Sequence, residues 1–409
     1  MTDFNQTHTS PVDRHLPDSE SESQSCHRQD RNPNAGVFDG PETRNPKPET
    51  QNTNSALSVN PGVEQPPMVD DVSLLRFLVR RRKILSLDEY VDGILQGNRT
   101  ILSQAITLVE SSLPEHAQMA QDIIERCLPY SGKSIRIGIT GVPGAGKSTF
   151  IEAIGGYLTS KEHKLAVLAI DPSSERSKGS ILGDKTRMEE LSADPNAFIR
   201  PSPSSGSLGG VARKTRETVF LCEAAGFDTI FIETVGVGQS ETAVHSMTDF
   251  FLLIQIAGAG DELQGIKRGI MEMADLITVN KADGNNLGKA QLAAAQYQSA
   301  LRLFPKHPSG WEPQATICSA ITRMGIDKIW SMVLQYVQLT KNNGFFDRRR
   351  HQQSKYWMTE TIHNSLIHHF YHHPHIETLL PEYEQKVSND QMSSFAAARA
   401  LLNEYFSMI

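Results

Sequence analysis

The chain has 409 residues, of which 38% are hydrophobic and 21% charged, and its formal net charge is −7. This is ordinary globular composition, and the length allows two domains or one domain with appendages. The negative charge argues against a general nucleic-acid-binding surface. Because no apolar run reaches the roughly 20 residues that a membrane span requires, we expect neither nucleic acid nor a membrane among the partners.

The four cysteines stand far apart in the sequence and form no CxxC pair; they are Cys26, Cys127, Cys222 and Cys318. This spacing argues against a disulfide framework or a cysteine zinc site, and it is typical of a reducing compartment. We therefore expect the protein to be cytoplasmic.

The first 71 residues differ from the rest of the chain. They carry 12 Asp or Glu, 5 Lys or Arg, and only Phe4 and Phe38 as aromatic residues. Such a segment cannot bury enough apolar surface to offset the entropy of ordering, so the sequence predicts a disordered acidic and polar tail over residues 1–71. A mitochondrial presequence is Arg-rich and acid-poor, which disfavours mitochondrial import.

Residues 72–131 have a helical pattern. In SLDEYVDGIL, Ser86 stands as a helix N-cap with Glu89 three residues later, the spacing of a capping box. The runs TILSQAITLVESSL and HAQMAQDIIERCL continue the helical period. The sequence predicts a helical N-terminal extension here.

From residue 132 the pattern changes to short apolar runs separated by helical segments. Nearly continuous apolar strands between helices are typical of a buried, mostly parallel sheet. The fold class is therefore α/β, with one domain over residues 132–341. Residues 342–409 are helical but too few for a core of their own, so we expect them to pack on the domain or on a second copy of the chain. The expected strands are residues 135–140, 165–171, 227–234, 249–256, 275–280 and 315–320.

The stretch GVPGAGKST follows the first expected strand and precedes a helix, so it satisfies the phosphate-loop motif GxxxxGK[ST] in its proper context. The glycines let backbone N–H groups surround an anion at the positive end of that helix. Lys147 is placed to reach the β and γ phosphates of a nucleotide, and the Ser148 hydroxyl to ligate Mg²⁺. The predicted phosphate-binding residues are Gly141, Val142, Pro143, Gly144, Ala145, Gly146, Lys147, Ser148 and Thr149.

The stretch NKAD, residues 280–283, follows the apolar run DLITV. Ligands of open α/β sheets bind at the carboxyl ends of strands. There Asp283 can accept hydrogen bonds from N1–H and the exocyclic amine of guanine, a pattern that adenine lacks. We predict that Asn280 holds the loop and that Lys281 covers the base. Ser319, Ala320 and Ile321, at the end of the last expected strand, are predicted to contact the base as well.

Two further loops leave strand ends near the expected phosphates. Residues 169–188 carry Asp171 and Asp184, and residues 232–241 carry Glu233 and Gly236. A Mg²⁺ ion held by one serine and phosphate oxygens keeps several waters, and these carboxylates are suited to bind those waters. Glycines would let the loops order around a γ phosphate and relax when it is lost.

A third loop, residues 258–270, is polar and Gly-rich and contains Lys267. One interpretation is a surface connection. The other is an additional switch that reports the nucleotide state to a partner.

Taken together, these motifs resemble the methylmalonyl-CoA mutase-associated GTPases of the MeaB and ArgK type. The resemblance runs from about residue 90 to the C-terminus and rests on ITLVES, GVPGAGKST, DPSS, GSILGDKTRM, FIRPSPSSGSLGG, ETVGVGQSE, GAGDELQGIKRGI and NKAD. It implies a P-loop NTPase domain flanked by an N-terminal helical extension and by C-terminal helices that form a homodimer.

The resemblance also implies a function. Family members are GTP-hydrolysing chaperones that bind an adenosylcobalamin-dependent acyl-CoA mutase, gate loading of its cofactor and protect it. Their cofactors are GTP or GDP and Mg²⁺, with a metal set that matches Ser148, Asp171, Asp184 and Glu233. Lys267 in the third loop is then the residue expected to respond to the partner, and it joins Lys147, Asp171 and Glu233 as the expected catalytic residues.

Two other functions remain open at this stage. A small-molecule kinase would share the phosphate loop but needs a substrate pocket with a base. A metallochaperone GTPase would need a metal-binding cluster, for which the histidine-rich run at 367–375 is the candidate, although Pro374 makes a helix end the better interpretation. Gln239 is the only glutamine after ETVG that could orient the hydrolytic water.

Overall fold

The computed structural model describes residues 85–111, 113–171, 188–203, 208–234, 240–258 and 268–408. The chain divides into two compact units, residues 1–79 and 80–409, and every described residue lies in the second. The predicted tail and the first part of the predicted N-terminal extension, up to residue 84, therefore lie outside the described residues. The domain boundaries stay predictions.

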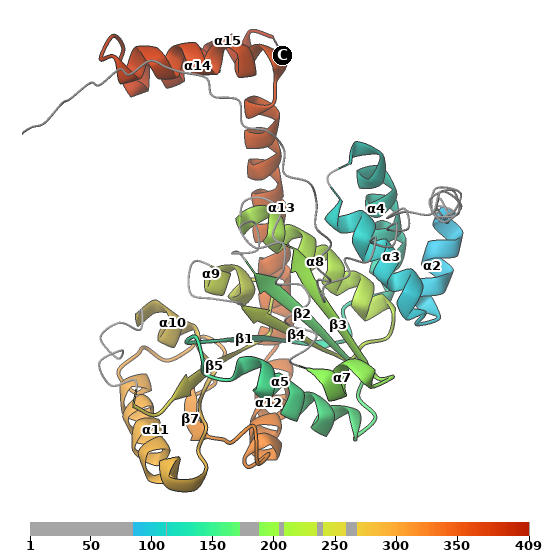
Figure 1. Cartoon of the computed structure of the whole chain (residues 1–409), viewed down its shortest axis with the longest axis vertical. Coiled ribbons are helices and arrows are strands. Elements are labelled where there is room, and N and C mark those ends of the chain that lie inside the picture. Colours follow the sequence, from blue (N-terminus) through green and yellow to red (C-terminus); the bar gives the residue numbers. More distant parts are fainter. Residues whose placement is uncertain are drawn as a thin grey trace, which may run out of the picture. The chain divides into compact units, whose positions relative to one another are not determined.

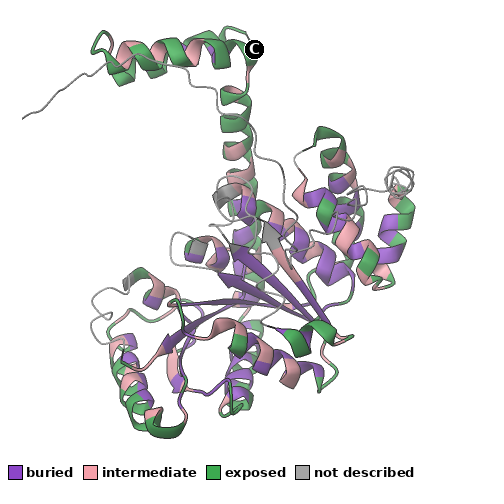
Figure 2. Ribbon diagram, viewed as in Figure 1, coloured by how far each residue is buried: buried purple, intermediate pink, exposed green. Residues whose placement is uncertain are grey.

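A seven-stranded sheet with the order β3-β2-β4-β1-β5-β6-β7 forms the centre of the second unit (Figure 1). Each pair of neighbouring strands is parallel, which confirms the predicted α/β class. Parallel sheets are buried on both faces, and Figure 2 shows the strands as mostly buried. The strands are β1 (Ile135–Gly141), β2 (Leu165–Asp171), β3 (Ala197–Pro203), β4 (Thr229–Thr234), β5 (Phe250–Ile256), β6 (Leu276–Asn280) and β7 (Gln314–Ile317).

Strand β3 is absent from the sequence prediction. It contains Pro201 and Pro203, which interrupt the apolar pattern, and it lies at the edge of the sheet, where a residue without a backbone N–H is tolerated. The last predicted strand is also shorter than expected. β7 stops at Ile317, and Ser319 then forms an isolated bridge with Met324.

Helices cover both faces of the sheet. Side chains alternate between the faces, so Ile230 and Ile232 of β4 pack with α2, α3, α4 and α8, whereas Phe231 packs with α5, α7 and α12. A third cluster joins α10 and α11 to β6. The helices are α2 (Leu87–Leu95), α3 (Arg99–Glu110), α4 (Pro114–Cys127), α5 (Lys147–Thr159), α7 (Glu189–Ala193), α8 (Leu208–Ala224), α9 (Ser240–His245), α10 (Arg268–Met273), α11 (Leu287–Leu301), α12 (Ile326–Asn342), α13 (Phe345–Tyr371), α14 (Pro374–Ser388) and α15 (Ser394–Phe406), with 3-10 turns η1 (Leu128–Tyr130) and η3 (Gly284–Asn286).

The described part of the N-terminal extension is helical, as predicted. Its first helix begins with the expected capping box: the Glu89 N–H donates to Ser86 Oγ at 3.3 Å, and the Ser86 N–H donates to Glu89 Oε2 at 2.7 Å. The extension is tied to the domain by Glu110 at the end of α3, which forms an ion pair with Arg200 of β3. The start of α2 is thus set by a local capping box, whereas the position of α3 against the sheet is held by a tertiary ion pair.

The long helix α13 packs on the domain through its first half only, where Phe346, Arg349, Gln353 and Trp357 are buried. Its second half is largely exposed and leads to α14 and α15 (Figures 1 and 2). Near its start the Arg350 guanidinium holds Asp249, with Nη2–Oδ2 at 2.6 Å and Nε–Oδ1 at 2.8 Å. Because a buried carboxylate needs such a partner, this ion pair fixes the base of α13 against the sheet.

The same region makes stability depend on pH through Asp275, just before β6. Burial raises the pKa of this carboxyl to about 6, against the partly opposing effects of Arg349 and of a hydrogen bond from the Phe251 N–H. A folded-state pKa above the unfolded value means that stability is greatest below about pH 4 and is lost as pH rises through 6. We predict that the free energy of unfolding of wild type, relative to Asp275→Asn, falls by about 2–3 kcal/mol between pH 4 and pH 7.

Urea unfolding of the two proteins across that pH range measures this difference. Groups that titrate identically in both, such as Asp249, cancel in the comparison. Parallel stability curves would show that Asp275 keeps an ordinary pKa.

Candidate functional site

The phosphate loop lies where predicted, between the end of β1 and the start of α5. Two positions of the loop require glycine because neighbouring protein atoms lie too close for a side chain. A Cβ on Gly141 would lie 2.0 Å from the Ile254 carbonyl oxygen, and one on Gly146 would lie 2.9 Å from Asn280 Nδ2. Gly146 also has φ +83°, a left-handed conformation that favours glycine. The loop therefore passes so close to β5 and to the NKAD stretch that side chains cannot be accommodated at these positions.

Lys147 is the first residue of α5, and its Nζ donates to the Gly141 carbonyl at 2.9 Å. Burial lowers the pKa of Lys147, while the nearby carboxylates of Glu233 and Glu241 act in the opposite direction. Ser148 and Thr149 follow in the first turn of the helix. The ammonium group therefore lies among the loop backbone and two acidic side chains, a position from which it can bind an anion held by the loop.

Ser148 at the start of α5, the end of β2 at Asp171, and Glu233 lie at the same edge of the sheet. Glu233 is buried near the end of β4, where its backbone pairs with Ile139 of β1 and Ala169 of β2. This register places the end of β2, at Asp171, beside the end of β4. Oxygen donors of this kind suit Mg²⁺, so Ser148 and Glu233 fit the expected ion.

The side chain of Asp171 lies outside what the structure describes, and so do Asp184, Gly236, Gln239 and Lys267. Among the described residues there is no group of three or more His, Cys, Asp or Glu side chains that could hold a metal. The complete metal set and the third loop stay predictions.

The side chain of Asn280 connects the phosphate loop to the stretch that follows β7. Its Nδ2 donates to the Ala145 carbonyl of the phosphate loop at 2.8 Å, and its Oδ1 accepts from the Ala320 N–H at 3.0 Å. Asn280 is 2% exposed, so its amide orientation is set by these partners. The phosphate loop and the expected base-binding loops are thereby held in one rigid arrangement.

Asp283 is oriented by Ser319, whose Oγ donates to Asp283 Oδ2 at 2.6 Å. The sequence predicted that Ser319 contacts the base, and the structure gives its side chain this supporting contact. Lys281 has φ +59°, an uncommon conformation for a residue with a side chain and one that recurs at functional sites. Ile321 is 78% exposed beside this loop. The carboxylate of Asp283 is thus held in place at the strand end.

Two supporting residues escaped the sequence prediction. Thr278 Oγ1 donates to Cys318 Sγ at 3.2 Å, and the thiol in turn contacts Asn280 Oδ1 at 3.5 Å. Thr278 belongs to no recognisable motif, whereas Cys318 begins the CSA stretch that also contains Ser319 and Ala320. Glu241 was also missed, although it is the last residue of the ETVGVGQSE stretch.

The histidine-rich run lies at the corner between α13 and α14. His369 Nδ1 lies 2.6 Å from the Tyr405 hydroxyl, and His372 Nδ1 lies 3.0 Å from the His368 carbonyl oxygen. The expected helix end is confirmed, since α13 stops at Tyr371, and Pro374 begins the next helix. The contact of His369 joins α13 to α15, and the contact of His372 lies within the end of α13.

Comparisons with known proteins place these features in context. A family model described as "Methylmalonyl Co-A mutase-associated GTPase MeaB" matches residues 102–375. "GTPase ArgK" of Escherichia coli K12 is 44% identical over 316 residues, which cover 77% of this chain and 96% of that protein. A Mus musculus protein, "Methylmalonic aciduria type A homolog, mitochondrial", is 45% identical over 331 residues, covering 78% of this chain and 80% of that one.

The fold has a solved counterpart. The structure described as "Crystal structure of LAO/AO transport system kinase" has 37% sequence identity and a TM-score of 0.64, and the match covers 80% of this chain and all of that one. Helical and sheet regions of the two proteins therefore share one architecture.

The geometry at Asp283 yields a test of base recognition. Asp283→Asn keeps one oxygen that can accept from N1–H but replaces the other with an N–H donor, which opposes the exocyclic amine of guanine and matches the 2-oxo group of xanthine. We predict that the affinity for GTP falls about 100-fold or more and that XTP becomes the preferred nucleotide.

Titration with fluorescent GTP and XTP analogues measures this change. Asp327→Asn, the same substitution at an exposed position on α12, is the matched control and should leave both affinities unchanged. An unchanged GTP affinity in Asp283→Asn would contradict the assignment of Asp283.

Proposed function

This chain belongs to the MeaB family of methylmalonyl-CoA mutase-associated GTPases, and from that premise we propose that it is a GTP-hydrolysing chaperone of an adenosylcobalamin-dependent acyl-CoA mutase. The partner is methylmalonyl-CoA mutase or a close relative, and the chaperone gates loading of its cofactor and protects or reactivates it. The GTPase part of this proposal is supported mainly by Asn280. Its hydrogen bonds join the phosphate loop to Ala320, and the neighbouring Ser319 holds Asp283.

In this proposal the backbone of residues 141–146 and the Lys147 ammonium bind the β and γ phosphates of GTP. Ser148, Asp171, Asp184 and Glu233 hold Mg²⁺ directly or through water. When bound, Mg²⁺ supplies charge neutralisation at the phosphates. The burial of Glu233 and the position of Lys147 beside it support this arrangement. GTP hydrolysis alone is slow, and the partner accelerates it by ordering the third loop with Lys267.

The partner assignment is supported by the family description, which names methylmalonyl-CoA mutase, and by the mouse relative, whose name refers to methylmalonic aciduria.

We also propose a cytoplasmic location. Cys127, Cys222 and Cys318 are free and buried, as expected in a reducing compartment. Among the described helices none is long and apolar enough to cross a membrane.

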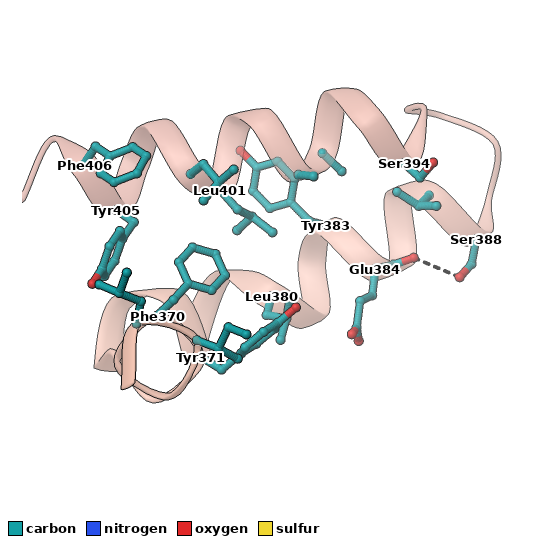
Figure 3. Close-up of a pocket in the computed structure, with 16 residues that line it drawn as sticks. Phe370, Tyr371, Leu380, Tyr383, Glu384, Ser388, Ser394, Leu401, Tyr405 and Phe406 are labelled. Carbon is teal, nitrogen blue, oxygen red and sulfur yellow. Dashed lines mark hydrogen bonds between the residues drawn. The ribbon is translucent and has the colours of Figure 1, made fainter. Parts of the chain in front are cut away.

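We further propose that the chain forms a homodimer through its last three helices. Helices α14 and α15 and the end of α13 line an open groove of about 770 Å³. Figure 3 shows Phe370, Tyr383 and Leu401 directed into the space between these helices. Leu366 and Phe406, which also line it, are 58% and 67% exposed. Contiguous apolar surface of this kind marks an association site, and a second copy would cover it by the same surface on both chains.

The primary prediction concerns hydrolysis. The purified protein should hydrolyse GTP slowly and ATP not measurably, and an adenosylcobalamin-dependent acyl-CoA mutase from the same organism should raise the GTP rate several-fold. Lys147→Ala should lower turnover about 100-fold or more, because it removes the cation at the developing phosphate charge. Phosphate release measures each rate.

Lys133→Ala, at an exposed position before β1, is the matched control and should behave as wild type. GTP turnover that no mutase alters would refute the chaperone part while keeping the GTPase part. Phosphorylation of an added small molecule from ATP would instead support the kinase alternative.

The second prediction concerns the dimer. Phe406→Asp places a charge on the apolar surface and should raise the dimer dissociation constant at least tenfold. Analytical ultracentrifugation over a concentration series measures it. Leu292→Asp, at a position 63% exposed on α11, is the control. A dimer that tolerates Phe406→Asp as well as Leu292→Asp would place the interface elsewhere.

A further inference from the structure

Cys318, the residue after β7, contacts the NKAD stretch at three points. Its backbone N–H donates to the Val279 carbonyl at 2.9 Å, and its own carbonyl accepts from the Ala282 N–H at 3.0 Å. Its Sγ lies 3.5 Å from Asn280 Oδ1. The side chain is fully buried. One residue therefore holds the end of β6, the amide of Asn280 and the turn that leads to Asp283.

The two backbone hydrogen bonds of Cys318 enclose Lys281. This residue has φ +59°, a conformation that persists only where the surrounding structure fixes it. The bonds to Val279 and Ala282 lie on either side of it and supply that constraint. Because both bonds use backbone atoms, they remain when the side chain at position 318 is changed. Substitutions there consequently test the thiol and not the turn itself.

The thiol of Cys318 is the middle member of a chain of hydrogen bonds. Thr278 Oγ1 donates to Cys318 Sγ at 3.2 Å, and Sγ donates in turn to Asn280 Oδ1. Burial raises the pKa of the thiol to about 11, against the opposing effect of the bond from Thr278, so the sulfur carries its proton near pH 7. A thiol is a weak donor, but buried hydrogen bonds in a chain polarise and strengthen one another.

The S–H group acts on the side of Asn280 that must accept. Asn280 Oδ1 also accepts from the Ala320 N–H at 3.0 Å, and its Nδ2 donates to the Ala145 carbonyl at 2.8 Å. A carbonyl oxygen has two lone pairs, so the two donors satisfy it. A reversed amide would place N–H groups against both donors and an oxygen against the Ala145 carbonyl. The thiol is therefore one of the groups that fix the direction of Asn280.

The neighbouring residue performs the matching task for Asp283. Ser319 Oγ donates to Asp283 Oδ2 at 2.6 Å and accepts from the Thr322 N–H at 3.2 Å. Adjacent side chains of the stretch after β7 thus hold the two polar residues of NKAD, Cys318 on Asn280 and Ser319 on Asp283. The arrangement of the expected base-binding turn depends on both.

We propose that the Cys318 thiol is a positioning residue for guanine-nucleotide binding, which acts by donating a hydrogen bond to Asn280. The proposal rests on the proposed GTPase function and adds a residue that sets its nucleotide affinity. Asn280 joins the phosphate loop to the base-binding stretch, so the thiol holds these two parts at their proper separation. Because GTP and GDP share the base, the thiol contributes equally to binding of both. It does not contribute to the rate of the chemical step once GTP is saturating.

The competing explanation is that Cys318 only fills space. It packs in the buried cluster between the sheet and the helices α5 and α12. The two explanations differ in the effect of serine at this position. Serine keeps a donor but loses the bulk and the apolar character of sulfur. If the side chain only fills space, Cys318→Ser is as defective as Cys318→Ala, whereas positioning predicts that serine restores binding.

The experiment is titration of the full chain with fluorescent GDP and a non-hydrolysable GTP analogue, both with Mg²⁺, together with GTP turnover. Cys318→Ala should raise the Kd of both nucleotides by the same factor, at least threefold, with kcat within twofold of wild type. Cys318→Ser should bring both Kd values back to within twofold of wild type. Thr278→Val, which keeps the shape but removes the hydroxyl that holds the sulfur, should raise both about twofold.

Cys222→Ala is the matched control. Cys222 of α8 is also fully buried, but it belongs to the cluster on the opposite face of the sheet. Its loss should lower the stability and leave both Kd values unchanged. Infrared spectra observe the thiol directly. The S–H stretching band that Cys318→Ala removes should lie below that of a free thiol and should move upward in Thr278→Val.

Kd values equal to wild type in both Cys318→Ala and Thr278→Val would overturn the proposal. So would Cys318→Ser that binds as weakly as Cys318→Ala, because the thiol then only fills space. If Cys318→Ala does not fold, Thr278→Val and the S–H band of the wild type decide between the explanations. Failure of wild type to bind GDP or GTP would instead count against the proposed function.

Discussion

The parallel direction of all the paired strands, with β1 between β4 and β5, is the constraint on which the rest of the structure depends. It brings the carboxyl ends of β1, β2, β4 and β6 to one edge, so that the phosphate loop, Asp171, Glu233 and the NKAD stretch lie together. It also brings the amino ends of β5 and β6 to the opposite edge. There Asp249 and Asp275 precede their strands and bind the arginines of α13.

The two edges of the sheet carry different kinds of polar group. At the carboxyl edge lie the phosphate loop, Lys147 and Asn280, whose amide is bonded to the Ala145 carbonyl and the Ala320 N–H. At the amino edge, carboxylates are buried and must be compensated, because an unpaired charge in the interior is costly. The short helices α9 and α10 run between the edges.

Features that depend on neighbouring residues could be predicted from the sequence, and features that depend on distant residues could not. The phosphate loop, the capping box at Ser86 and the apolar strands depend on neighbouring residues, and they were predicted. Strand β3 was missed because its prolines break the apolar pattern and only its edge position makes them acceptable. Thr278 and Cys318 were missed because the Thr278–Cys318 and Cys318–Asn280 contacts join residues 40 and 38 positions apart.

The sequence by itself determined the α/β class, all the strands except β3 and the nucleotide motifs, because periodicity and short motifs are local properties of the chain. Only the tertiary structure decided that Asn280 bridges the phosphate loop, that Ser319 orients Asp283 and that Arg349 meets His245. The last two residues are 104 positions apart. Such contacts depend on how strands are ordered and helices packed, which no local pattern in one sequence records.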